Sequence, residues 1–120
     1  MSEPGLLVLV EDDRELREAV ALVLRARGWD VVPSETGEEA LAVLEEKEAD
    51  VVVADLGLPG RSGPELVEAL RAAAPGARVV VFTGEVAADV RRACLDAGAD
   101  DYLVKPVSGG DLAELLSAGG

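Results

Sequence analysis

The chain has 120 residues, 49% of them apolar, which predicts a single domain over residues 1–120 with its folded core at about 6–117. Twenty-four acidic against eleven basic residues leave a formal net charge of −13, which disfavours direct binding to nucleic acid. One cysteine excludes an intrachain disulfide, and the absence of histidine excludes a phosphohistidine carrier, a histidine-ligated metal centre and a Ser-His-Asp triad within this chain.

Nothing in the sequence indicates a membrane protein. The longest apolar run, residues 19–24, is far short of the roughly 20 residues that span a bilayer, and residues 1–5 lack a signal-peptide pattern. A lone cysteine, Cys94, fits a reducing compartment. We therefore expect a cytoplasmic protein without membrane association.

The first third of the chain predicts two strand–helix units. Residues 6–10 form an apolar run, and apolar residues then recur at helical spacing at positions 16, 20, 23 and 24. Gly28 ends this helix, and residues 29–32 are predicted as the second strand. Thr36 and Glu39 form a capping box that predicts the start of a second helix, whereas Asp13 is predicted to cap the first.

Three further strands follow in the same alternation. Residues 51–54 are apolar throughout, as is typical of a parallel strand covered on both faces, and Asp55 follows them. Pro64 suits the first turn of a third helix, and residues 79–82 are predicted as a strand ahead of Thr83. A fourth helix is predicted over about residues 86–97, then a strand at 102–104 ahead of Lys105. A short last helix carries leucines at 112, 115 and 116.

Alternating strands and helices with short connections predict an α/β fold: a five-stranded, doubly wound parallel sheet with helices on both faces. Ligands bind such sheets outside the carboxyl ends of the strands. Four of the five predicted strands end there in polar groups, namely Glu11 with Asp12, Asp55, Thr83 and Lys105. These residues form the candidate site.

The residue types at this site favour phosphoryl chemistry with a metal ion. Clustered carboxylates repel one another and call for a cation, and oxygen ligands favour Mg²⁺ over Zn²⁺. An aspartate beside Mg²⁺ can act as a nucleophile that forms an aspartyl phosphate, and Asp55 fits that role. The Lys105 ammonium and the Thr83 hydroxyl are complementary to a transferring phosphoryl group. Taken singly, Thr83 would be interpreted as a turn hydroxyl and Lys105 as a solvated charge.

Five segments together resemble the receiver domains of two-component response regulators, over essentially the whole chain from Leu6 to Leu116. They are VEDD at residues 10–13, TGEEAL at 36–41, DLGLPGRSG at 55–63, FTG at 82–84 and GADDYLVKP at 98–106. The resemblance implies a flavodoxin-like strand order 2-1-3-4-5 and a bacterial signal-transduction role, including phosphorelay.

The resemblance also assigns roles to the site residues. It implies that Asp55 accepts a phosphoryl group from a histidine kinase or histidine phosphotransfer protein. Mg²⁺ would be held by Asp12, Asp55 and the backbone carbonyl of Gly57, with Glu11 assisting through water. Thr83 and Lys105 would contact the phosphoryl group.

Further implications concern switching and output. Tyr102 would turn inward when Thr83 moves, and the face of the fourth helix, fifth strand and fifth helix would bind a downstream protein. The Lys105–Pro106 peptide would be cis. The chain would catalyse only its own phosphorylation and dephosphorylation, and no output domain is expected in it.

Other possibilities stay open at this stage. A Mg²⁺-dependent phosphohydrolase of the haloacid dehalogenase type would want a second aspartate two residues after the nucleophile, where Gly57 stands. A phosphate-independent interaction domain would not need the complete set of polar groups. The kinase, the pathway, the parent protein, the oligomeric state and the lifetime of the phosphoryl group, which Gly57 and Glu85 would tune, are not specified by the sequence.

Overall fold

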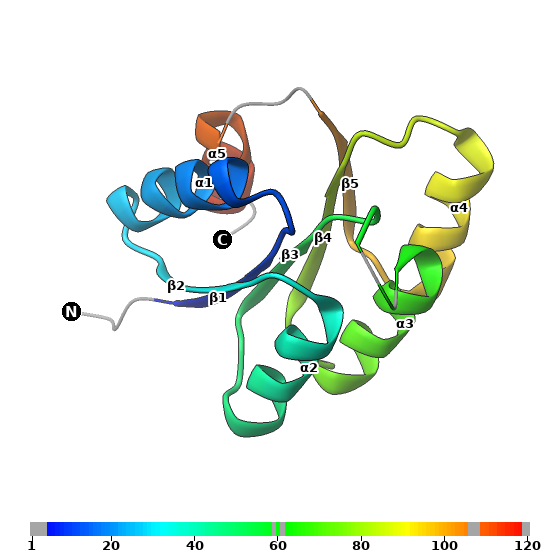
Figure 1. The fold of residues 1–120 in the computed structure, drawn as a ribbon, viewed down its shortest axis with the longest axis horizontal. Helices are drawn as coiled ribbons and strands as arrows, with labels where there is room; N and C mark the ends of the chain where they lie inside the picture. The colour runs from blue at the N-terminus through cyan, green and yellow to red at the C-terminus, as the bar shows by residue number, and fades with distance from the viewer. Residues whose placement is uncertain (1–4, 59, 61, 106–108, 119–120) are drawn as a thin grey trace.

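The computed structural model describes residues 5–58, 60, 62–105 and 109–118. Within these residues five strands alternate with five helices, and the strands form one parallel sheet in the order β2-β1-β3-β4-β5, which confirms the predicted fold (Figure 1). The elements in chain order are β1 (Leu6–Val10), α1 (Arg14–Ala26), β2 (Asp30–Ser34), α2 (Gly37–Glu46), β3 (Val51–Ala54), α3 (Gly63–Ala73), β4 (Arg78–Thr83), α4 (Ala88–Ala97), β5 (Asp101–Val104) and α5 (Gly109–Ala118).

Helices cover both faces of the sheet, with α1 and α5 on one face and α2, α3 and α4 on the other (Figure 1). Successive residues of β1 therefore enter different cores: Leu7 and Leu9 pack toward α1 and α5, and Val8 and Val10 toward α2 and α3. Burying such a side chain contributes about 1.5–3 kcal/mol. This two-sided burial explains why the strands are continuous apolar runs. No helix among the described residues is long and apolar enough to span a bilayer.

Three strands differ in their bounds from the prediction. The second strand is Asp30–Ser34 and not residues 29–32, because β2 is an edge strand paired only with β1 and so tolerates Pro33 within it. The fourth strand is Arg78–Thr83 and not residues 79–82, and the fifth begins one residue early, where the Asp101 carboxylate accepts a hydrogen bond from Arg78 Nε at 2.8 Å.

The fourth helix begins at Ala88, two residues later than predicted. The Glu85 carboxylate accepts a hydrogen bond from the Ala87 backbone N–H at 2.9 Å, which holds the chain before the helix in a turn. Val86 is consequently left exposed rather than placed on an inward helix face. Cys94, further along α4, is buried in the core.

Helix caps follow the prediction closely. The Asp13 carboxylate accepts from Leu16 N at 3.2 Å at the start of α1, and the Thr36 hydroxyl accepts from Glu39 N at 3.1 Å at the start of α2. The Glu39 carboxylate accepts from Glu35 N, one residue earlier than in a standard capping box. Two hydrogen bonds therefore connect Glu39 to the loop after β2, one to the Glu35 backbone and one to the Thr36 side chain.

Arg71 connects three elements at the end of the sheet opposite the candidate site. Its guanidinium donates to the Gly98 carbonyl at 3.0 and 2.9 Å, to the Ala77 carbonyl at 2.6 Å and to the Asp100 carboxylate at 2.6 Å. It therefore fixes the end of α3, the residues before β4 and the connection between α4 and β5.

Candidate functional site

Adjacent strands deliver the acidic residues to one edge of the sheet. β1 and β3 are parallel neighbours with Val10 opposite Ala54, so the residues that follow them emerge side by side. Backbone hydrogen bonds continue beyond the strands: Asp55 N donates to the Val10 carbonyl and Glu11 N to the Ser34 carbonyl, each at 3.0 Å. The backbone of both acidic residues is therefore fixed by the sheet.

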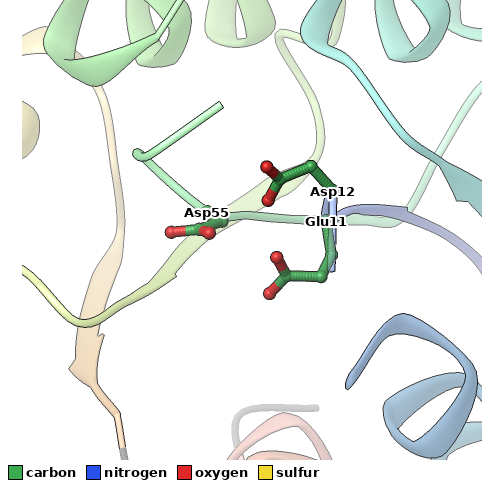
Figure 2. A group of neighbouring side chains, drawn as sticks. All are labelled: Glu11, Asp12 and Asp55. Carbon is green, nitrogen blue, oxygen red and sulfur yellow. The ribbon is translucent and has the colours of Figure 1, made fainter. Parts of the chain in front are cut away.

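Glu11, Asp12 and Asp55 form an acidic cluster. One carboxylate oxygen of each lies within 4.8 Å of the others, and the Glu11 and Asp12 side chains extend from the end of β1 toward Asp55 (Figure 2). Glu11 is 3% and Asp55 9% exposed, whereas Asp12 is open to solvent. Burial raises the pKa of Glu11, the nearby Asp55 charge adds to the rise, and hydrogen bonds from Lys105 and the Asp13 backbone oppose it.

This donor set fits Mg²⁺. The ion prefers oxygen ligands, is usually held by one or two carboxylates and keeps several waters, and the solvent-facing side at Asp12 leaves room for them. Gly57, predicted to supply a backbone carbonyl, is exposed and donates its N–H to Asp55 Oδ1 at 3.3 Å. Its carbonyl as a ligand stays a prediction.

Lys105 joins the cluster from the end of β5. Its Nζ lies 2.7 Å from Glu11 Oε1, 3.4 Å from Asp55 Oδ2 and 5.4 Å from the centroid of the Phe82 ring. Burial lowers the pKa of Lys105, but the hydrogen bond and charge of Glu11 together with those of Asp55 outweigh it, so the net shift is upward. The side chain therefore stays an ammonium beside two carboxylates.

Thr83 ends β4 beside Asp55 and is 3% exposed. Its hydroxyl accepts a hydrogen bond from Glu85 N at 3.3 Å. A cleft of about 500 Å³ opens here, lined in part by Asp55, Gly57, Thr83 and Glu85. The Asp55 carboxylate can thus be approached through this cleft, where Gly57 has no side chain to obstruct access.

Tyr102, on β5, is bonded to the same loop residue as Thr83. Its hydroxyl donates to the Glu85 carbonyl at 2.9 Å, and its ring packs against the core between α3, β4 and α4. Burial raises the pKa of Tyr102, the nearby Cys94 and Glu85 add to the rise, and Arg91 opposes it. Glu85 therefore connects Thr83 to Tyr102 through its two backbone groups.

The structure brings Glu11, Asp12, Asp55, Thr83 and Lys105 to one edge of the sheet, as the positions of the strand ends indicate. The predicted cis peptide between Lys105 and Pro106 lies outside the described residues. Sequence reasoning missed a further residue.

Arg17 is the residue that was missed. Its Nη1 donates to the Glu11 carbonyl at 2.9 Å and lies 3.5 Å from the Asp12 carbonyl. A sequence signal for it exists: position 17 stands three and four residues before Val20 and Ala21, both buried, so it places a charged side chain on the inward face of α1.

Comparison with known proteins gives a consistent result. The family described as "Response regulator receiver domain" matches residues 7–117. A probable transcriptional regulatory protein, TcrX of Mycobacterium tuberculosis, is 38% identical over 106 residues, which are 88% of this chain and 45% of that protein. The chain spans about half or less of the length of such curated relatives.

Solved structures agree with this match. A CheY-like response regulator receiver domain protein from Methanospirillum hungatei superposes with a TM-score of 0.92 at 29% identity, covering 98% of this chain and 94% of that one. The receiver domain of the sensor histidine kinase PA1611 from Pseudomonas aeruginosa has a TM-score of 0.84 at 27% identity, with 96% of each chain covered. That structure holds a magnesium ion coordinated in its active site cleft.

Proposed function

The chain belongs to the response regulator receiver domain family, and from this premise we propose that it is a signalling switch controlled by phosphorylation of Asp55. The phosphoryl donor is a partner histidine kinase or histidine phosphotransfer protein. The observation that carries the proposal is the position of the Asp55 carboxylate at a strand end, within 4.8 Å of ligand oxygens of Glu11 and Asp12 and 3.4 Å from the Lys105 ammonium.

The chemistry of this site is nucleophilic displacement at phosphorus. An Asp55 carboxylate oxygen attacks the phosphorus atom, the P–N bond to the donor histidine breaks, and its electron pair leaves with the imidazole ring. The cleft beside Asp55 provides space for the donor. Lys105, whose Nζ lies 3.4 Å from Asp55 Oδ2, offsets charge on the phosphoryl oxygens. Thr83 lines the same cleft as Asp55 and offers its hydroxyl to them.

A divalent cation belongs to this proposal. Asp12, Asp55 and the Gly57 carbonyl would hold Mg²⁺, with Glu11 acting through water. When bound, Mg²⁺ supplies positive charge that stabilises the phosphoryl oxygens during transfer. The Lys105 ammonium offsets part of the repulsion among the three carboxylates, which amounts to about 4 kcal/mol per pair of charges 4 Å apart in a medium of effective dielectric 20, and a metal ion would offset the rest.

Switching follows from the two bonds at Glu85. A Thr83 hydroxyl drawn to the phosphoryl group gives up its hydrogen bond to Glu85 N, which loosens the residue that also holds the Tyr102 hydroxyl. Tyr102 can then turn inward and change the face formed by α4, β5 and α5, which we propose binds a downstream protein. A shift from 1:99 to 99:1 requires about 5.5 kcal/mol of differential interaction.

The proposed activity of this chain is confined to phosphorylation, and the downstream response is produced by a partner. We propose that the chain itself catalyses only its own phosphorylation and dephosphorylation, and that it acts in the cytoplasm, where the single cysteine stays reduced. The net charge of −13 argues against direct contact with nucleic acid.

The primary test is covalent modification of Asp55. The protein is incubated with acetyl phosphate and Mg²⁺, and the intact mass is compared with those of Asp55→Asn and of Asp96→Asn, an exposed aspartate on α4. We expect one added phosphoryl group in the wild type and in Asp96→Asn, and none in Asp55→Asn. Equal modification of all three would refute the assignment.

The switch is tested separately with beryllofluoride, a phosphoryl mimic. Amide chemical shifts are recorded for the wild type and for Thr83→Ala. We expect shifts across residues 86–102 in the wild type that shrink in Thr83→Ala, while shifts around Asp55 remain. Equal responses in both proteins would contradict a relay through Thr83.

A further inference from the structure

We propose that Arg17 positions the carboxylates of the β1–α1 loop for binding Mg²⁺, a role that rests on the function proposed above. Within the described part of the chain, its guanidinium contacts the backbone carbonyls of that loop. Its effect on the carboxylates would therefore pass through the backbone, so Arg17 is a positioning residue and not a ligand.

The contacts of Arg17 converge on the loop that carries two of the three carboxylates. From the second turn of α1, Nη1 reaches back to the Glu11 carbonyl at 2.9 Å and to the Asp12 carbonyl at 3.5 Å. Nη2 contacts the Glu35 carboxylate, after β2, at 3.4 Å. One planar guanidinium therefore connects α1, the β1–α1 loop at residues 11–13 (the acidic loop) and the β2–α2 loop.

Burial distinguishes Arg17 from an ordinary surface arginine. Its side chain is 11% exposed, whereas that of Arg14, one turn earlier on the same helix, is 81% exposed and pairs with Glu18. Removing a mostly buried guanidinium from two backbone carbonyls leaves those carbonyls without their donor. Arg14 can be removed at no comparable loss, which makes it a matched control.

Exposure and charge repulsion both favour movement of the acidic loop. Asp12 is exposed, and when no metal ion is bound the three carboxylates repel one another, with the Lys105 ammonium in contact with only Glu11 and Asp55. Peptide planes at Glu11 and Asp12 set the directions of the two side chains, so holding their carbonyls restricts where the carboxylates can go. Groups that orient metal ligands in this indirect way typically contribute about 10–100-fold to metal affinity.

An electrostatic role and a positioning role predict opposite changes in Mg²⁺ affinity when Arg17 is removed. The guanidinium is a positive charge close to the cation site, so its electrostatic effect alone opposes Mg²⁺ binding, and its loss would tighten binding. If Arg17 acts by positioning, its loss weakens binding despite the more negative local field. The sign of the change therefore separates the two roles.

The experiment measures Mg²⁺ affinity by calorimetry and NMR at fixed ionic strength for the wild type, Arg17→Gln, Arg17→Lys and Arg14→Gln. We expect binding about tenfold weaker in Arg17→Gln and unchanged or slightly tighter in Arg14→Gln. Arg17→Lys keeps the positive charge but lacks the planar guanidinium with its several N–H donors (the fork), and we expect an intermediate affinity for Mg²⁺. Amide shifts of residues 11–13 without Mg²⁺ should change in Arg17→Gln and not in Arg14→Gln.

Three outcomes would overturn the inference. Mg²⁺ binding in Arg17→Gln as tight as in Arg14→Gln would leave Arg17 with a structural role only. If Arg17→Gln does not fold, Arg17→Lys decides, and wild-type affinity in that variant refutes positioning by the fork. A wild-type protein that binds no Mg²⁺ refutes the proposed function and this inference with it, whereas the first two results leave the proposed function intact.

Discussion

Lys105 lies closer to Glu11 than to the candidate phosphoacceptor: its Nζ is 2.7 Å from Glu11 Oε1 and 3.4 Å from Asp55 Oδ2. Glu11 is almost fully buried, so the ion pair compensates a carboxylate that water cannot solvate. A phosphoryl group on Asp55 would compete with Glu11 for the same ammonium.

Replacing Lys105 with methionine should lower the free energy of unfolding in Mg²⁺-free buffer by about 2 kcal/mol. The change leaves the Glu11 carboxylate buried and unpaired beside Asp55; a fully buried pair would lose about 3–5 kcal/mol, and the partial exposure of Lys105 reduces this. Mg²⁺ should then stabilise the variant more than the wild type. Urea unfolding with and without Mg²⁺ measures both effects, with Lys47→Met at an exposed position as the control. Similar losses in the two variants would contradict the prediction.

Asp12 and Asp13 should separate metal binding from stability. Asp12→Asn removes one charge from the repelling cluster, so it should weaken Mg²⁺ binding strongly and raise Mg²⁺-free stability by about 1 kcal/mol. Asp13→Ala removes the cap on Leu16 N, so it should lower stability by about 1 kcal/mol and change Mg²⁺ affinity little. Calorimetric titration and urea unfolding of both variants test the crossed pattern. A larger metal effect at Asp13 would mean that the cluster has been assigned one residue out of place.

Tyr102 is the single tyrosine of the chain, so its ionisation can be followed by ultraviolet absorbance. The midpoint should lie above the ordinary pKa of 10.0, chiefly because of burial. Glu85→Gln should lower the midpoint by removing a negative charge, and Arg91→Gln should raise it by removing a positive one. Midpoint shifts in the same direction in the two variants would contradict the placement of Glu85 and Arg91 near the Tyr102 hydroxyl.

The same group predicts the direction of a stability change in alkaline solution. A raised folded-state pKa means that unfolded Tyr102 releases its proton first as the pH rises past 10. The contribution is therefore fully present below pH 10 and is lost as the pH rises through the folded-state pKa. Comparison of wild type with Tyr102→Phe by urea unfolding isolates this change, because the phenylalanine variant lacks it.

Gly98→Ala should destabilise the protein by about 1–3 kcal/mol. Gly98 has φ +122°, which side chains rarely adopt, and a Cβ there would lie 2.8 Å from Arg71 Cγ. Gly76→Ala is the matched control, since no atom lies within 4 Å of the added Cβ and its φ is not positive. Thermal unfolding of both variants tests the difference, and a comparable loss at Gly76 would show that the effect is not specific to the Arg71 contact.

The sheet and most of the site could be predicted from the sequence because they depend on local patterns. Buried strands such as Val51–Ala54 are recognisable as apolar runs, and polar residues directly after them must meet at one edge of a parallel sheet. Asp13 is identifiable as a cap from its position alone, since capping uses atoms within one turn.

The remainder depends on contacts between distant residues or on side chains outside the helical pattern. The late start of α4 results from the Glu85 side chain bonding Ala87, and nothing in the helical period of the segment excludes residues 86 and 87. Pro33 obscures the end of β2 in the sequence, because an edge strand tolerates proline where a central strand does not. The helical spacing places Arg17 on the inward face of α1, but its partners, the backbone carbonyls of Glu11 and Asp12, are known only once the β1–α1 loop is seen to fold over it.

The pairing of Lys105 with Glu11 joins residues 94 positions apart, and this has a consequence for biosynthesis. A nascent chain that has emerged only as far as β4 already contains all three carboxylates of the cluster but not the ammonium that compensates them. In the proposed mechanism that ammonium offsets charge on the phosphoryl oxygens, so a chain that ends before Lys105 would accept a phosphoryl group less readily than the full sheet. Full competence would arrive with the last strand, after the rest of the sheet has been made.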